Sequence, residues 1–366
     1  MKVPYNYLPM QFADVERIIS EWRQLISTTE FTLGPFVERF EKQFSEYLGV
    51  KHCISTNTGT DALILALKSV GIGNGDEVIT VTNTFYATVG AIVATGATPV
   101  FVDSDDRFQI DVDKIIPAVT NRTKAVIPVH WAGASPDLDA LSTICSEHNI
   151  YLIEDACMGI GTSVSGKPAG TYSSVSGFSL HPLKSLHVMG DGGMTATNDD
   201  DLARWLKTYR NHGMVDRNHI TMWGINNRLQ PLQAVVASIE LESIDKTIRK
   251  RHKNAKILDS GLSDLSDRIF LPERKNSNVE NYSLYMGLFQ ERDLLRAYLE
   301  HFDIETKVHY PIPLHLQAAA SNLPYSKGDF PNSEKQAEEL LTLPVHQYLE
   351  EEHLHYMINK IHDFYD

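Results

Sequence analysis

A lysine next to a glycine-rich turn is the first residue that could do covalent chemistry. Lys184 lies in GFSLHPLKSLHVMGDGG (177–193), in a loop after an expected strand. Lysine forms imines with carbonyl compounds, and partial desolvation lowers its pKa enough to make it nucleophilic. Because a loop lysine is more commonly a solvated surface charge, Lys184 needs support from other features.

A carboxylate at the end of an apolar strand is the second such feature. The segment IEDA places Asp155 at the end of the expected strand 150–156. A buried carboxylate is costly unless it is paired. A protonated pyridinium nitrogen would be a suitable partner, and a buried ion pair or a helix cap is the alternative.

A short glycine turn before a helix is the third feature. In STNTGTDAL (55–63), Thr58, Gly59 and Thr60 precede an expected helix over 60–70. The start of a helix offers free N–H groups to a phosphate, and glycine lets the backbone approach the ligand closely. Simple N-capping by threonine is the alternative.

Strand and helix patterns alternate from about residue 60 to residue 200. The expected strands are 76–81, 98–104, 123–130 and 150–156, and the expected helices are 60–70, 84–96, 111–119 and 137–149. The strands are nearly continuous apolar runs, which is typical of a parallel sheet with helices on both faces. Such sheets bind ligands outside the carboxyl ends of their strands, where the three features fall.

The rest of the chain predicts additional elements and a second domain. Two extended stretches follow at 174–180 and 192–198, then a helix at 200–213 and a long helix from Pro231 to about residue 258. We therefore predict a large domain over 1–255 and a smaller α+β domain over 256–366.

Composition narrows the classes of function. The chain has 366 residues and a formal net charge of −14, which argues against nucleic acid as a partner. Neither a long apolar run nor a signal-peptide core is visible, so we expect no membrane span and a cytoplasmic location. The three cysteines are expected to be free thiols, and no metal site is predicted.

Taken in order, these motifs resemble the DegT/StrS-type sugar aminotransferases, which are fold-type I enzymes that use pyridoxal 5'-phosphate (PLP). The resemblance extends over nearly the whole chain. It includes FTLGPFVERF, GDEVITVTNTFYAT, TKAVIPVHWAG, IEDA, FSLHPLKSLHVMGDGG, GINNRLQPLQA, KVHYPIPLHLQ and LTLPVH. It implies a large domain with a mainly parallel, seven-stranded type of sheet.

The resemblance also implies a role for individual residues. Lys184 matches the lysine that carries PLP, and Asp155 matches the acid that keeps its ring nitrogen protonated. The remaining matches are Gly59, Thr60 and Ser179 at the phosphate, Phe85 stacked on the ring, and His309 and Tyr310 at the substrate. Asn226 matches an asparagine that the neighbouring subunit extends to the phosphate, which implies a homodimer with shared active sites.

One position departs from the family pattern, and several functions remain open. Met158 stands where the family usually has Gln or His, and Met cannot donate the same hydrogen bond.

The implied reaction moves an amino group from glutamate or glutamine to a keto sugar, usually a nucleotide-linked 3- or 4-keto deoxysugar. The alternatives are a keto-sugar phosphate acceptor, sugar dehydration, a PLP-binding regulatory protein and a catalytically silent assembly subunit. A related dehydratase branch has histidine in place of the lysine, so Lys184 favours transamination.

Overall fold

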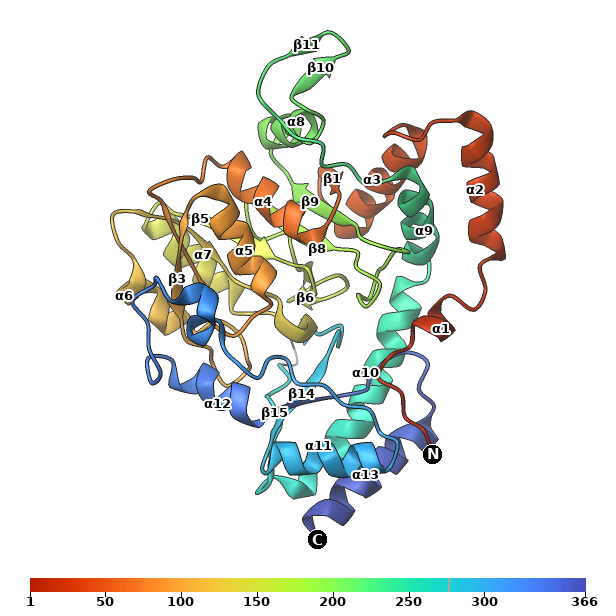
Figure 1. Cartoon of the computed structure of the whole chain (residues 1–366), viewed down its shortest axis with the longest axis vertical. Coiled ribbons are helices and arrows are strands. Elements are labelled where there is room, and N and C mark those ends of the chain that lie inside the picture. The colour runs from red at the N-terminus through yellow and green to blue at the C-terminus, as the bar shows by residue number, and fades with distance from the viewer. Residues whose placement is uncertain (276) are drawn as a thin grey trace.

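The computed structural model describes residues 1–275 and 277–366, and a seven-stranded sheet forms the centre of its larger part (Figure 1). In spatial order the strands are β1 (His52–Thr56), β9 (Gly193–Thr197), β8 (Val175–Ser179), β5 (Tyr151–Asp155), β4 (Thr123–Ile127), β2 (Glu77–Val81) and β3 (Thr98–Val102). Five neighbouring strands, from β3 to β8, run parallel, whereas β9 is antiparallel to β8 and to β1. The prediction of a mainly parallel, seven-stranded α/β sheet is confirmed.

Helices cover this sheet on both faces, which explains its apolar strands. All five residues of β2, of β8 and of β9 are buried. The covering helices include α3 (Pro35–Leu48), α4 (Gly59–Ser69), α5 (Tyr86–Thr95), α7 (Leu138–Glu147), α8 (Asp200–Tyr209) and α9 (Pro231–Leu241). The expected helix over 111–119 is only a short turn followed by α6 (Ile115–Ala118).

The prediction of a single continuous helix from Pro231 to about residue 258 is wrong. The structure has two helices, α9 (Pro231–Leu241) and α10 (Ile244–Gly261), with a break at Glu242 and Ser243. Helix α9 packs in the core around α3, and Ile244 and Ile248 at the start of α10 join the same core. Further along α10, Ala255 and Leu258 enter the core of the C-terminal part.

The C-terminal part is a small α+β unit. Its antiparallel sheet contains β12 (Ile269–Phe270), β14 (Tyr285–Phe289) and β15 (Leu340–Leu343), and α11 (Arg292–His301) and α13 (Glu351–Tyr365) accompany it (Figure 1). The boundary after residue 255 stays a prediction, and that position lies inside α10. At the other end of the chain, Val3 pairs with Ile304 and joins the same core.

None of the helices in the described ranges combines the length and the apolar character needed to cross a membrane.

Candidate active site

A cavity of about 780 Å³ lies at the carboxyl ends of β5 and β8, where α4 and α5 begin. It gathers eight of the nine site residues predicted from the sequence, which come from segments far apart in the chain. These residues are Gly59, Thr60, Phe85, Asp155, Ser179, Lys184, His309 and Tyr310. Asn226 is not among the lining residues of its own chain.

The loop that carries Lys184 is held by the N-terminal segment. The hydroxyl of Tyr7 donates to the carbonyl of Leu183 at 3.0 Å, and the Gln11 side-chain amide donates to the carbonyl of Pro182 at 2.9 Å. Burial lowers the pKa of Lys184 below its ordinary value, although the acidic side chains of Cys157 and Asp155 oppose this shift. A lowered pKa increases the fraction of neutral amine near pH 7, which is the form that acts as nucleophile or base.

Asp155 presents a buried carboxylate to the cavity. Its Oδ2 accepts from the Thr88 hydroxyl at 2.8 Å, its Oδ1 accepts from the Cys157 N–H at 3.1 Å, and only 3% of the residue is exposed. No Lys, Arg or His nitrogen of residues 1–275 and 277–366 lies within the 4.0 Å of an ion pair with it. A buried charge without a partner is costly, so this carboxylate suits a cationic ring nitrogen of a ligand.

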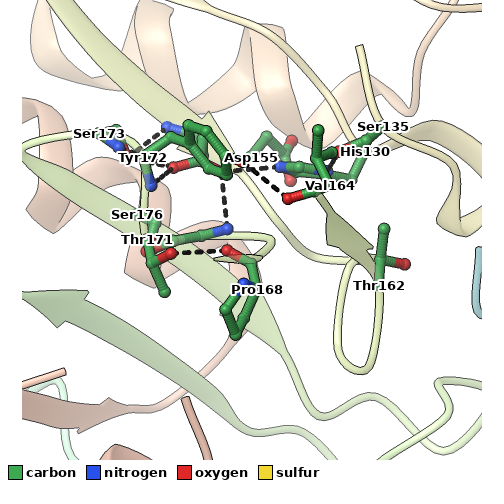
Figure 2. Close-up of polar contacts among 12 residues, drawn as sticks. His130, Ser135, Asp155, Thr162, Val164, Pro168, Thr171, Tyr172, Ser173 and Ser176 are labelled. Carbon is green, nitrogen blue, oxygen red and sulfur yellow. Dashed lines mark hydrogen bonds and ion pairs between the residues drawn. The ribbon is translucent and has the colours of Figure 1, made fainter. Parts of the chain in front are cut away.

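A buried polar network fixes the strand end that carries Asp155 (Figure 2). Glu154 points to the opposite side of β5 and accepts from His130 Nε2 at 3.0 Å and from the backbone N–H groups of Tyr172 and Ser173. The Ser135 hydroxyl bonds the other ring nitrogen of His130, Nδ1, at 2.8 Å. The backbone N–H of His130 donates to the backbone carbonyl of Asp155 at 3.0 Å. These hydrogen bonds therefore hold both of the last two residues of β5, Glu154 and Asp155, in place.

The N-terminus of α4 forms a close-fitting cradle with Ser179. Thr58 caps this helix by accepting from the Asp61 N–H at 2.9 Å, so the capping interpretation of Thr58 is correct. The N–H groups of Gly59 and Thr60 belong to the first turn, whose N–H groups have no partner within the helix. A Cβ at Gly59 would lie 2.6 Å from the Cβ of Ser179, so only glycine fits here. Helix N–H groups beside a serine hydroxyl make a suitable phosphate site.

Gly59→Ala tests this cradle. Because the added methyl group displaces Ser179, we expect cofactor affinity to fall about tenfold, which corresponds to about 1.4 kcal/mol and lies within the usual overpacking cost. Titration of the purified chain with PLP, followed by absorbance, measures the effect. Gly73→Ala is the matched control, since its nearest neighbour, the Thr95 carbonyl oxygen, would be 3.8 Å away. Equal PLP affinities in the two variants would contradict the assignment of Gly59 and Ser179 to the phosphate site.

Aromatic side chains form one wall of the cavity. The Phe85 ring lies 3.9 Å from the Tyr86 ring and 6.0 Å from the Tyr310 ring, measured between centroids, and Phe85 is 37% exposed. Met158 lines the same cavity, so the departure from the family pattern lies at the site itself. Burial, together with the nearby Lys184, lowers the pKa of His309 to about 4, so this imidazole is neutral at pH 7.

The sequence interpretation missed several lining residues. Tyr5, Tyr7, Trp131, Arg251, Ser283 and His346 also border the cavity. They come from the N-terminus, from the turn after β4, from α10 and from the C-terminal part. Trp131 and His346 lie in segments that resemble the family, but neither was assigned to the site from the sequence. Arg251 lies in a helix rich in Lys and Arg, where a charged residue is ordinarily read as solvent-exposed.

Together, these features define a class of site. An amine with a lowered pKa, an unpaired buried carboxylate and a phosphate cradle surround one cavity with an aromatic wall. They match the aldehyde, the ring nitrogen and the phosphate of PLP, so the described residues fit this group.

Comparison with known proteins agrees with this class. Residues 13–362 match the model of the DegT/DnrJ/EryC1/StrS aminotransferase family, and the chain belongs to that family. Two curated relatives cover most of it. The "Pleiotropic regulatory protein" of Geobacillus stearothermophilus is 37% identical over 100% of this chain and 99% of its own length. The "dTDP-3-amino-3,4,6-trideoxy-alpha-D-glucose transaminase" of Micromonospora megalomicea subsp. nigra is 35% identical over 94% of each chain.

Solved structures of other proteins also have a fold similar to that of this chain. The crystal structure of S. venezuelae DesV in complex with a ketimine intermediate has a TM-score of 0.96 and 34% identity, covering 99% of this chain and 98% of that one. NtdA from Bacillus subtilis, solved with the bound cofactor PMP, has a TM-score of 0.89 and 30% identity, covering 98% of this chain and 85% of that one. The predicted family and fold are therefore confirmed.

Proposed function

We propose that this protein transfers an amino group from glutamate or glutamine to a keto sugar, with PLP as the cofactor. A nucleotide-linked 3- or 4-keto deoxysugar is the favoured acceptor, because the Micromonospora relative is named as a transaminase of a dTDP-linked amino sugar. The observation that carries the proposal is that Lys184, Asp155 and the Gly59–Ser179 cradle all border one cavity.

Each group has a distinct task in this reaction. When bound, PLP supplies an electron-withdrawing ring conjugated with a carbon that bonds amines. The N–H groups of Gly59 and Thr60 and the hydroxyl of Ser179 would hold its phosphate, and Asp155 would keep its ring nitrogen protonated. Lys184 would hold the cofactor covalently at rest. In turnover, Lys184 Nζ takes the proton from the α-carbon of the donor, and it later returns a proton to the sugar carbon that receives the amine.

A transamination assay with the purified chain tests this function. Glutamate and glutamine are compared as donors, and a nucleotide-linked keto deoxysugar is compared with a keto-sugar phosphate as acceptor. We expect amino-sugar formation with the nucleotide-linked acceptor. Formation only with the sugar phosphate would correct the acceptor class, and loss of oxygen from the sugar would point to dehydration.

A non-catalytic regulatory protein is the second candidate, and the printed name of the Geobacillus relative is the observation that favours it. An inert binding protein has no need for a base of lowered pKa at the cofactor. Bleaching of the cofactor absorbance by glutamate would therefore exclude both this candidate and a silent assembly subunit. Cytoplasmic location stays a prediction, which cell fractionation tests.

We also propose a homodimer in which Asn226 serves the partner's site. Asn226 is exposed and forms an isolated β-bridge with Asn211. Between these two residues in the chain lie β10 (Met214–Asp216) and β11 (His219–Ile220), a hairpin that projects from the body of the molecule (Figure 1). Trp223 is 87% exposed, and Val215, Ile220 and Ile225 are also exposed. Exposed apolar side chains gathered in this way are typical of a protein interface. The alternative is a local role, since Asn226 Oδ1 accepts from Arg228 Nε at 2.8 Å.

Mixed dimers separate these two roles of Asn226. Lys184→Ala and Asn226→Asp, the latter of which repels phosphate, should each be inactive alone. If the sites are shared, a mixture should regain about a quarter of the activity per chain, because half of the dimers are hybrids with one intact site. Subunit exchange is verified first with differently tagged chains. Absence of rescue after verified exchange would assign Asn226 to its own chain or to no site.

A further inference from the structure

A buried arginine lines the candidate active-site cavity. Arg251, on α10, is 1% exposed and borders the same cavity as Lys184. Its Nε donates to Gln347 Oε1 at 3.0 Å, its Nη1 to the Tyr282 carbonyl at 3.2 Å and its Nη2 to the Tyr7 hydroxyl at 3.0 Å. All three acceptors are neutral, and a guanidinium has five N–H groups to donate.

The other buried arginines of the described ranges form ion pairs with carboxylates, whereas Arg251 does not. Arg210 pairs with Glu41 and Arg292 pairs with Asp293. Within residues 1–275 and 277–366, no carboxylate lies within the 4.0 Å of an ion pair with Arg251. A buried charge of this kind is stabilised when an anion completes its environment.

A buried histidine with a nitrogen that lacks a hydrogen-bond partner in the described ranges lines the same cavity. His346 is 3% exposed and lines the cavity, and its Nε2 donates to the Pro4 carbonyl at 2.9 Å. Its Nδ1 is buried and has no hydrogen-bond partner among the described residues. Burial, with a contribution from Arg251, lowers the pKa of His346 to about 4, so Nδ1 is an acceptor at pH 7.

Two consecutive hydrogen bonds connect Arg251 to the loop that carries Lys184. The Tyr7 hydroxyl accepts from Arg251 and donates to the carbonyl of Leu183, the residue before Lys184. Two hydrogen bonds of 3.0 Å thus separate the guanidinium from the loop that carries the lysine. Arg251 and Lys184 border the same cavity, so a ligand that reacts at Lys184 shares this space with Arg251.

We propose that Arg251 binds a carboxylate of the ligand that reacts at Lys184, and that His346 Nδ1 accepts a hydrogen bond from the same ligand. This proposal rests on the proposed aminotransferase function and adds a subsite to it. A carboxylate fits because its single charge balances one guanidinium, and its two oxygens match the guanidinium fork. The carboxylate can belong to the amino-acid donor or to an acidic keto sugar, and the two sources are distinguished by experiment.

The test compares three forms of the PLP-loaded protein: wild type, Arg251→Gln and the control Arg292→Gln. Arg292 is also buried and also donates to backbone carbonyls, but it does not line the cavity. The first readout is calorimetric binding of glutarate, a dicarboxylate without an amine. We expect binding to weaken about 10- to 100-fold in Arg251→Gln only, as for other hydrogen bonds to charged groups.

The two half-reactions then identify the source of the carboxylate. A rise in KM for glutamate, with the acceptor half-reaction unchanged, assigns the subsite to the donor. A rise confined to a keto sugar that carries a uronic carboxylate assigns it to the acceptor. Unchanged glutarate binding and unchanged KM values in a folded Arg251→Gln protein would overturn the proposal.

A structural measurement covers the case in which Arg251→Gln does not fold. In a crystal of the wild-type holoenzyme soaked with glutarate, one carboxylate should lie within hydrogen-bond distance of Arg251, and a carboxylate bound elsewhere would overturn the proposal. Failure of the proposed function is a separate result, namely a wild-type protein that transfers no amino group to any acceptor.

Discussion

Lys184→Ala should abolish turnover while leaving the fold and much of the cofactor affinity intact. The phosphate cradle at Gly59 and Ser179 and the carboxylate of Asp155 come from other segments, so they remain in the variant. We expect turnover to fall about 10⁴-fold or more, the upper end of the effect of losing a general acid–base catalyst. Single-turnover absorbance with glutamate measures the loss.

Chemical labelling gives an independent test of the same residue. Borohydride reduction of the loaded protein, followed by peptide mapping, should place the pyridoxyl group on Lys184. Lys167 is the matched control, because its ammonium group lies 4.0 Å from the centre of the Tyr172 ring and it does not border the cavity. Label on Lys167, or normal turnover by Lys184→Ala, would rule out the assignment.

Asp155→Asn should lower turnover about a hundredfold, or about 3 kcal/mol of barrier height. Asparagine keeps the shape and can still bond Thr88 and the Cys157 N–H, so we expect the fold to persist. It removes the charge that holds the ring nitrogen in its protonated form, and a neutral ring withdraws electrons less strongly. The rate of the glutamate half-reaction, measured at saturating cofactor, reports the effect.

A second carboxylate provides the control for Asp155. Asp191 also borders the cavity but is exposed, so its charge is screened by water. Asp191→Asn should leave the half-reaction nearly unchanged. If the two substitutions have equal effects, the loss reflects general charge in the cavity, and Asp155 has no special role at the ring nitrogen.

The order of elements and most of the site were predictable from the sequence. The apolar strands, the helix after Gly59 and the loop around Lys184 follow from local patterns, because each depends on residues close together in the chain. The resemblance to a known family then linked motifs that lie far apart. By contrast, the long helix after Pro231 was predicted as continuous, since no proline or glycine marks the break at Glu242 and Ser243. After the break, α10 runs from the core that it shares with α9 into the core of the C-terminal part, an arrangement of distant segments that no local pattern reports.

The sequence by itself determined the family, the type of sheet and the three segments that meet at the cavity. Only the tertiary structure decided which side chains are buried without a charged partner. Arg251 reads as one of several basic residues on a polar helix, and it becomes a candidate subsite only because the N-terminus and the C-terminal part cover it. Burial and charge compensation depend on contacts between distant segments, and a local pattern carries no information about them.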